Sequence, residues 1–300
     1  MPSIPTIVNR LLESEAGRRQ PVAVLARLAG WQLWRRGLRR PMTFKTVTGA
    51  TLTLLPGASE SISGFWYHQI PNFEELAFAL HLLHPNDVFV DVGANQGGWS
   101  LIAAGRGARV ISFEPVPLTR ARLAANVAAN PVAIRERVRI VPLGLSDQAG
   151  SVSFTADLDS GNHRIRDQAE AVNKTITVEL ARADDILRLE YPALMKIDVE
   201  GEELGVLKGG RSLLGKDSLR AVVMETFRPH NFATPTLIAA EAILREHDFV
   251  PMAYNPWRRE LLPLVQPSDG AQNTIYVRDP LAVSARLRKS EPVRAFGTRM

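Results

Sequence analysis

Short apolar segments alternate with longer amphipathic segments from Val88 to Asp279. In the longer segments apolar residues recur every three or four positions, as they do on one face of a helix. The apolar segments predict strands at VFVDV (88–92), RVISFEP (109–115), RVRIVPLGLS (137–146), ALMKIDVEG (193–201) and LRAVVMETF (219–227). The amphipathic segments predict helices at 97–107, 118–130, 202–214 and 236–247. This alternation predicts an α/β fold, in which a mostly parallel sheet has helices on both faces.

Two stretches depart from the alternation. GSVSFTAD (150–157) and KTITVEL (174–180) predict an antiparallel pair inserted at about 150–182. FVPMAYN (249–255) and NTIYVRD (273–279) predict a second antiparallel pair, at one edge of the sheet.

The residues before Val88 have a different pattern. The first forty residues predict a helix that is broken at Pro21. TFKTVTGATLTLLP (43–56) predicts a hairpin, and NFEELAFALHLLH (72–84) predicts a helix with Asn72 as its cap. The expected segments are a basic helical arm at 1–41, a hairpin and helix extension at 42–85, a main domain at 86–280 and a basic tail at 281–300.

Composition limits the chemistry. The 300 residues include no cysteine, which excludes disulfides, thiolate metal sites and a cysteine nucleophile. No apolar run approaches the roughly 18 residues of a membrane span. The first residues also lack the pattern of a secretory signal. We therefore expect a cytoplasmic protein.

The positive charge is concentrated near the two ends of the chain. The net charge is +5, and much of the excess lies in Trp34–Arg40 and Val283–Met300. Because the middle is close to balanced, we expect no nucleic-acid groove. The segment Arg27–Arg40 mixes tryptophan and leucine with arginine, as helices at membrane surfaces do. A helix packed on its own domain is favoured, and peripheral contact of the arm with the inner membrane surface remains the alternative.

The stretch FVDVGANQGGWS (89–100) places glycines directly after a predicted strand. In parallel α/β sheets, ligands bind beyond the carboxyl ends of the strands. The spacing G-x-x-x-G-G differs from the G-x-G-x-x-G of dinucleotide sites, so a nicotinamide oxidoreductase is disfavoured. Glu114 ends the next strand, where an acid can accept both hydroxyl groups of a ribose. Together the loop and the acid predict a nucleoside-containing ligand.

Each of these residues also has a structural explanation. Gly93 could relieve a strand-to-helix turn, and Asn95 could cap the helix. Asp91 could cap or form a local ion pair, and Glu114 could be a solvated strand end. These alternatives stay open at the level of the sequence.

Four stretches together resemble the FkbM-type methyltransferases. They are DVGANQGGWS, ISFEPVP, PLGLSD and LMKIDVEGEELGVLKGG, of which the last is the most specific. The resemblance covers roughly Thr43 to Asp279. It implies a Rossmann-like class I methyltransferase fold with a seven-stranded sheet and S-adenosylmethionine as the cofactor. It also implies O-methylation of a small-molecule or glycan acceptor, most often on a sugar, glycan or glycolipid hydroxyl.

The same resemblance assigns a set of cofactor-binding residues. Gly93 and Gly97 would line the methionine part, Asp91 and Asn95 would hold its polar ends, and Glu114 would bind the ribose. Leu145 and Ser146 would lie against the adenine. Two further candidates are Glu74, in a stretch similar to one of the family, and Asp198, which we also expect to be catalytic. A helix N-terminal acid stabilised by the dipole is the alternative for Glu74.

The segment KIDVEGEE (196–203) carries the candidate catalytic carboxylate. In a strand, Lys196, Asp198 and Glu200 share one face, and Asp198 lies at the carboxyl end. An alcohol must lose its proton during methyl transfer, and His163, in the insertion, titrates in a suitable range. We expect His163 and Asp198 to be the catalytic pair and no metal to be bound. The alternatives are an exposed loop histidine at His163 and a metal held by Asp198 and Glu200. Lys196 is more simply a buried partner of an acid, and Glu203 is structural.

Other functions stay as alternatives. The basic ends would suit an RNA methyltransferase, but the chain lacks N-P-P-[YF] and has no cysteine for carbon-5 chemistry. A protein of another class would bind a membrane surface and keep a vestigial nucleoside site. The sequence carries no signal for the oligomeric state.

Overall fold

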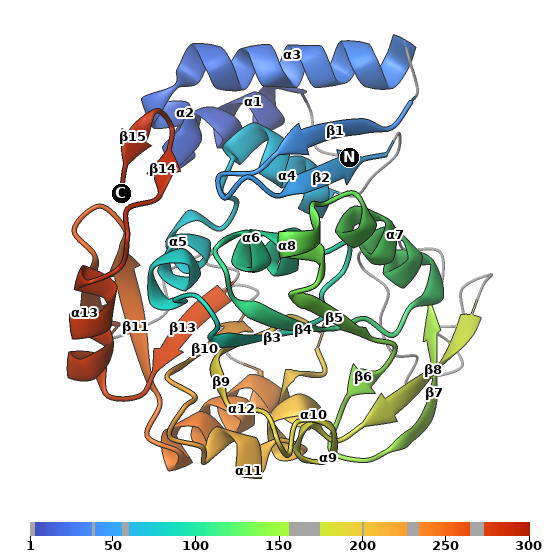
Figure 1. Cartoon of the computed structure of the whole chain (residues 1–300), viewed down its shortest axis with the longest axis vertical. Coiled ribbons are helices and arrows are strands. Elements are labelled where there is room, and N and C mark those ends of the chain that lie inside the picture. The colour runs from blue at the N-terminus through green and yellow to red at the C-terminus, as the bar shows by residue number, and fades with distance from the viewer. Residues whose placement is uncertain are drawn as a thin grey trace.

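An eight-stranded sheet runs through the middle of the computed structural model, with helices above and below it (Figure 1). The structure describes residues 4–37, 40–55, 60–155, 175–199, 201–226, 234–264 and 273–300. The strand order is β12-β11-β13-β10-β9-β3-β4-β5. The bounds are β3 Val88–Val92, β4 Arg109–Phe113, β5 Val138–Val141, β9 Pro192–Ile197, β10 Ala221–Glu225, β11 Val250–Asn255, β12 Glu260–Pro263 and β13 Asn273–Val277.

The neighbouring strands β10, β9, β3, β4 and β5 are all parallel to one another, and β13 is antiparallel to β10 and β11. The predicted mostly parallel α/β sheet with helices on both faces is therefore confirmed. The eighth strand, β12, was not predicted. It pairs with β11 at the sheet edge and is largely exposed, so its residues do not show the alternation that marks a half-buried strand.

Two hydrophobic cores lie on opposite faces of the sheet. The lower face in Figure 1 carries the helices α9 Ala183–Ile186, α10 Glu203–Lys208, α11 Arg211–Leu214 and α12 Pro235–Glu246. The upper face carries α4 Glu60–His68, α5 Phe73–Leu82, α6 Gly98–Gly105, α7 Pro117–Ala128 and α8 Val132–Arg135. Helix α13, Pro280–Arg288, packs beside α5 and β12.

The N-terminal residues belong to the upper core. They form α1 Ile4–Glu13, α2 Glu15–Arg19, α3 Pro21–Gly37, β1 Met42–Lys45 and β2 Thr51–Leu54. Leu11, Val24 and Trp31 are buried in the same cluster as Phe89 of the central sheet. The helix break at Pro21 and the hairpin are thus confirmed, and α3 packs on its own domain. A second break, at Ser14, separates α1 from α2. The described helices include none that combines the length and the hydrophobicity needed to cross a bilayer.

Side chains of α7 fasten the N-terminal hairpin to the main domain. The Asn126 amide oxygen accepts the N–H of Thr53 at 3.0 Å, and its amide nitrogen donates to the carbonyl of Gln96 at 2.8 Å. The loop that follows β3 is therefore held directly against the N-terminal hairpin.

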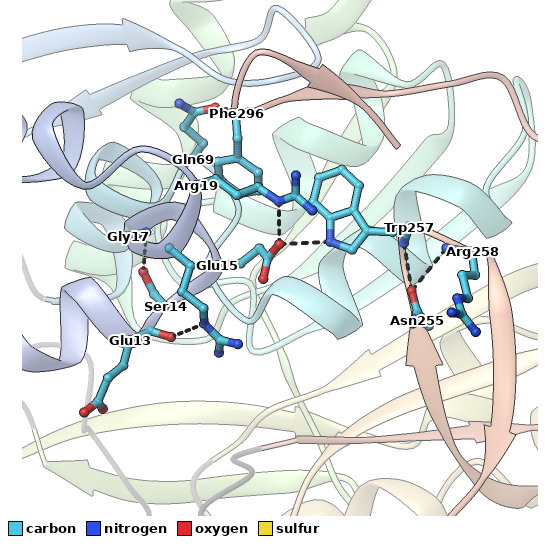
Figure 2. A network of polar contacts seen from close by, with 11 residues as sticks. Glu13, Ser14, Glu15, Gly17, Arg19, Gln69, Asn255, Trp257, Arg258 and Phe296 are labelled. Atoms are coloured by element: carbon cyan, nitrogen blue, oxygen red, sulfur yellow. Dashed lines mark hydrogen bonds and ion pairs between the residues drawn. The ribbon is translucent and has the colours of Figure 1, made fainter.

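The second helix is joined to the turn between β11 and β12 (Figure 2). The carboxylate of Glu15 accepts hydrogen bonds from Arg19 at 2.6 Å and from the indole N–H of Trp257 at 2.9 Å. The Arg19 guanidinium lies 3.5 Å from the centre of the Trp257 ring. Phe73 of α5 and Phe296 each pack against this tryptophan. Residues far apart in the sequence thus meet at one place.

The last residues are folded onto the domain. They form α13 and a hairpin of β14 Arg294–Ala295 and β15 Thr298–Arg299. Phe296 is buried and donates its N–H to the Gln69 side chain at 3.1 Å. The basic residues of this segment therefore lie on a packed helix and hairpin.

The predicted insertion is a three-stranded sheet. It consists of β6 Gly144–Leu145, β7 Gly150–Thr155 and β8 Thr175–Ala181, and β7 pairs antiparallel with β8 as predicted. The segment 156–174, with the candidate base His163, lies outside the described residues.

The single helix predicted from Glu202 to Leu214 is wrong, because the chain forms two short helices there. The break falls at Gly209-Gly210. A side chain at Gly209 would place its Cβ 2.0 Å from the carbonyl oxygen of Ser146. The carboxylate of Asp184 accepts the N–H groups of Ser212 and Leu213 and so caps the second helix.

Replacing Gly209 by alanine should destabilise the protein by about 1–3 kcal/mol, because the new Cβ overlaps backbone that cannot move freely. Gly215→Ala is the matched control. Both glycines follow a short helix with right-handed backbone, but the Cβ at Gly215 meets nothing closer than 3.5 Å. Urea unfolding of both variants measures the difference. Equal stability of the two would contradict the close approach of α10 to Ser146.

Candidate active site

The loop after β3 is held in a left-handed conformation at three positions. The φ angles are +78° at Gly93, +51° at Asn95 and +89° at Gly97. Its N–H groups are largely engaged: those of Gly93 and Ala94 donate to Phe113, and that of Gly97 donates to Ala94. The loop therefore does not present these groups to a pyrophosphate, in agreement with its spacing.

The glycines also permit close packing. A Cβ at Gly93 would lie 1.9 Å from the carbonyl oxygen of Asp198, and one at Gly97 would lie 2.4 Å from Leu123. A Cβ at Gly98 would lie 2.3 Å from the ring of Phe65. The structural explanation of Gly93 thus applies, because only glycine lets the ends of β3 and β9 approach so closely.

Glu114 lies at the carboxyl end of β4 and is buried. One carboxylate oxygen accepts the N–H of Asn95 at 3.0 Å, and the other accepts that of Val116 at 2.9 Å. It is therefore not a solvated strand end. Burial raises the pKa of Glu114 to about 7, against the opposing effect of these two hydrogen bonds. Each oxygen keeps acceptor capacity beyond its one N–H partner.

Asp91 is fully buried at the end of β3. Its Oδ2 accepts a hydrogen bond of 2.5 Å from Ser100, which also contacts the Ser112 hydroxyl at 2.8 Å. Its Oδ1 has no hydrogen-bond partner among the described residues and lies 3.9 Å from the ammonium group of Lys196. Burial raises the pKa of Asp91, although Lys196 and Ser100 act in the opposite direction.

Lys196 joins β9 to this network. Its ammonium group donates to the carboxylate of Asp198 at 2.8 Å and lies 5.8 Å from the centre of the Trp99 ring. Burial alone would lower the pKa of Lys196, but the carboxylates of Asp198 and Asp91 raise it above its ordinary value. Lys196 is therefore the buried partner of two acids, as its position in the strand suggested, and it stays protonated.

The chain beyond Asp198 is held by Glu203. The carboxylate of Glu203 accepts the N–H groups of Val199 at 3.3 Å and Gly201 at 3.1 Å, which makes its role structural, as expected. Glu200 lies outside the described residues. Within the part of the chain that the structure describes, no three histidine or acidic side chains gather into a metal site.

Leu145 and Ser146 lie at the junction of β6, β8 and α10, and both are buried. The Ser146 N–H donates to the carbonyl of Ala181 at 3.0 Å. The structure places this pair near the end of β4, because a Cβ at Gly144 would lie 3.7 Å from Pro115.

The predicted site residues that the structure describes thus fall into three groups. Asp91, Gly93, Asn95, Glu114 and Asp198 meet at the carboxyl ends of β3, β4 and β9, with Gly97 at the start of α6. The pair Leu145 and Ser146 lies beside them. Glu74 lies elsewhere, in the first turn of α5, where it lines a pocket with residues of β11 and β13.

The match to known proteins is clear. Residues 91–251, more than half of the chain, match the family model described as the methyltransferase FkbM domain. The chain belongs to the FkbM methyltransferase family. It is accordingly a methyltransferase, and the sequence resemblance is confirmed.

Two curated relatives extend the match. This FkbM-family methyltransferase is 30% identical to the hexuronic acid methyltransferase AglP of Haloferax volcanii over 246 residues, which cover 76% of this chain and 96% of AglP. It is 29% identical to the 31-O-demethyl-FK506 methyltransferase FkbM of Streptomyces tacrolimicus, over 70% of this chain and 90% of that protein. Among solved structures, methyltransferase FkbM from Methylobacillus flagellatus KT aligns with a TM-score of 0.43 and 18% identity, over 65% of this chain and 44% of that one.

Some features of the site could not be read from the sequence. The hydroxyl group of Ser100, from α6, meets Asp91 only in the folded chain, and the hydroxyl group of Ser112, from β4, meets Ser100 there. The pocket beside Glu74 also includes Glu75 and Asn273, which are 198 positions apart. In the sequence, only the adjacent acids Glu74 and Glu75 pointed to this pocket, and a position at a helix N-terminus explains them equally well.

Lys196→Met should cost about 3–5 kcal/mol of stability, because it leaves the buried carboxyl group of Asp91 without its cation. Without Lys196 the raised pKa of Asp91 rises further, so the folded state holds a proton that the unfolded state releases. The loss should therefore grow as the pH rises from 5 to 8.

Urea unfolding at both pH values measures this effect. The exposed Lys208→Met is the matched control and should be nearly neutral. Adding Asp91→Asn to Lys196→Met should remove most of the dependence on pH. A Lys196→Met protein as stable as the parent would contradict the network.

Proposed function

We propose that this methyltransferase transfers a methyl group from S-adenosylmethionine to a hydroxyl group of a sugar or a glycan. Membership of the FkbM family supports methyl transfer. The sugar is proposed from AglP, whose name gives a hexuronic acid as its substrate and which this chain matches over nearly its whole length. The observation that carries the cofactor is the position of Glu114.

Glu114 fits a ribose because it is a buried carboxylate without a cationic hydrogen-bond partner on its side chain. Two backbone N–H groups fix its orientation, and the remaining acceptor capacity suits two neighbouring hydroxyl groups. Asp91 fits the polar end of the methionine part, because its Oδ1 is a buried acceptor without a hydrogen bond. Gly93, Asn95 and Gly97 would form the wall between them, with Leu145 and Ser146 beside the adenine. When bound, the cofactor supplies a methyl group on a positively charged sulfur.

Asp198 is placed to orient the acceptor. It ends β9, is partly exposed, and is held by Lys196 at 2.8 Å. Because Lys196 is a cation with a raised pKa, it does not take the proton of the alcohol. We assign that proton to His163, which the sequence places in the insertion, outside the described residues. Alignment of the two reacting groups and exclusion of water would supply the rest of the rate.

The affinity for S-adenosylhomocysteine should depend on Glu114. Glu114→Gln should weaken binding roughly tenfold or more, because hydrogen bonds to a charged group contribute about 1.5–3 kcal/mol each. The parent should also bind roughly tenfold more weakly at pH 6 than at pH 8, because a group with a pKa of about 7 becomes largely protonated. Calorimetry at both pH values measures this. Glu136→Gln, at an exposed position, is the control, and equal affinity of the Glu114 variant would end the ribose assignment.

The catalytic pair makes a separate prediction. His163→Ala should reduce turnover by at least about 10²-fold, because general-base catalysis is typically worth about 10²–10⁴-fold, and should leave S-adenosylhomocysteine affinity unchanged. Asp198→Asn should reduce both. Single-turnover rates against pH, with a methylated sugar product as the readout, should lose the limb near the histidine pKa only in the His163 variant. Retention of that limb would reject His163 as the base.

A further inference from the structure

A pocket lies between helix α5 and the antiparallel end of the sheet. Its cavity volume is about 60 Å³, and the hollow together with the open space at its mouth is about 390 Å³. Its walls are Glu74, Glu75, Met252, Ala253, Tyr254, Leu264, Asn273, Thr274 and Ile275. The proposed roles of Asp91, Glu114 and Asp198 do not use these residues.

The strand register places this pocket close to the expected site of methyl transfer. In the sheet, Met224 pairs with Ile197 and Glu225 pairs with Asn273, so the ends of β9, β10 and β13 lie side by side. With strands about 4.8 Å apart, Asn273 lies roughly 10 Å from Asp198 along this edge.

The pocket and the lysine network also share one face of the sheet. Lys196 faces Trp99 of α6, and α6 packs against α5, whose first turn forms the pocket wall. A ligand could therefore reach from Asp198 to the pocket without crossing the sheet.

Two polar groups in the pocket lack a hydrogen-bond partner on any other described residue. The carboxyl group of Glu75 has no hydrogen bond or ion pair with another described residue, and only its own backbone N–H approaches it. Burial raises the pKa of Glu75 to about 7, and the neighbouring Glu74 adds to this effect. The side chain of Asn273 is buried, and within the described part of the chain its Oδ1 has no hydrogen-bond partner. A buried acceptor of this kind is costly unless a ligand or water satisfies it.

The rest of the lining mixes apolar side chains with the polar side chains of Glu74 and Thr274. Met252, Leu264 and Ile275 supply hydrocarbon surface beside the two polar groups. A pyranose ring has the same division, with hydroxyl groups around its rim and C–H groups on its faces. Concave sites with a mostly apolar wall and a few placed polar groups are typical of small-molecule binding.

We infer that Glu75 and Asn273 bind hydroxyl groups of the methyl acceptor, and that this acceptor is a sugar whose bound part carries no negative charge. The inference rests on the proposed function, which supplies the reaction. A carboxylate acceptor would meet two acidic side chains at Glu74 and Glu75. Burial raises the pKa of Glu74, although Arg18 acts in the opposite direction, and burial raises the pKa of Glu75 to about 7. The proposed acceptor of this chain therefore differs from the hexuronic acid that the name of AglP gives.

Titration with simple glycosides tests the inference. The probes are the methyl pyranosides of glucose, galactose and mannose and the methyl glucuronide, each titrated by saturation-transfer NMR with and without saturating S-adenosylhomocysteine. We expect at least one neutral glycoside to bind at least about tenfold more tightly than the glucuronide. Glu75→Ala and Asn273→Ala should each weaken that neutral glycoside by at least about tenfold.

Two controls separate binding from folding. Glu179→Ala, at an exposed position of β8, should bind the glycoside as the parent does. Affinity for S-adenosylhomocysteine should be unchanged in the Glu75 and Asn273 variants, and Glu75→Gln should narrow the preference for neutral over charged sugar.

Three results would overturn the inference. They are a parent protein that binds none of the neutral glycosides, tighter binding of the glucuronide, or unchanged glycoside affinity in both alanine variants. Loss of S-adenosylhomocysteine binding in the parent would instead contradict the proposed function, and the titrations without that ligand would still decide the role of the pocket.

Discussion

The arrangement of the site depends on one buried cation. Lys196 lies between the carboxyl groups of Asp91 and Asp198, at the ends of two neighbouring parallel strands. Carboxylates held so near to each other would repel one another without it. The lysine allows acids on adjacent strands at one edge of the sheet, and Gly93 allows the same strand ends to approach closely. The ion pairs of Lys196 and the missing side chain of Gly93 thus act at the same strand ends.

Glu114 performs a related task one strand away. It binds the N–H of Asn95 in the loop and that of Val116 beyond β4, so a single carboxylate joins both turns of the proposed cofactor site. Because burial raises the pKa of Glu114 to about 7, its carboxyl group is partly protonated at neutral pH. The acceptor pocket contains a second acid of the same kind, Glu75, on the other side of the Lys196 network.

The sequence predicted the features that follow from local periodicity. The parallel strands, their helices and the hairpin were visible because each element repeats at its own spacing, and Glu114 followed from its place at a strand end. The break at Gly209 was missed because it results from contact with Ser146, which is distant in the sequence. Strand β12 is largely exposed, so its residues do not alternate between apolar and polar. Glu75 and Asn273 line one pocket only because α5 packs near β13. Such contacts exist only in the folded chain.

The contact of Glu15 with Trp257 has a consequence for how the protein is made. Its two residues are 242 positions apart, and Phe296, which packs on the same tryptophan, comes later still. During synthesis Glu15 of α2 therefore meets this partner only after nearly all of the domain has left the ribosome. Long-range contacts of this kind slow folding and leave a partly made chain open to aggregation. The part of the domain around Trp257 is consequently the last to be completed.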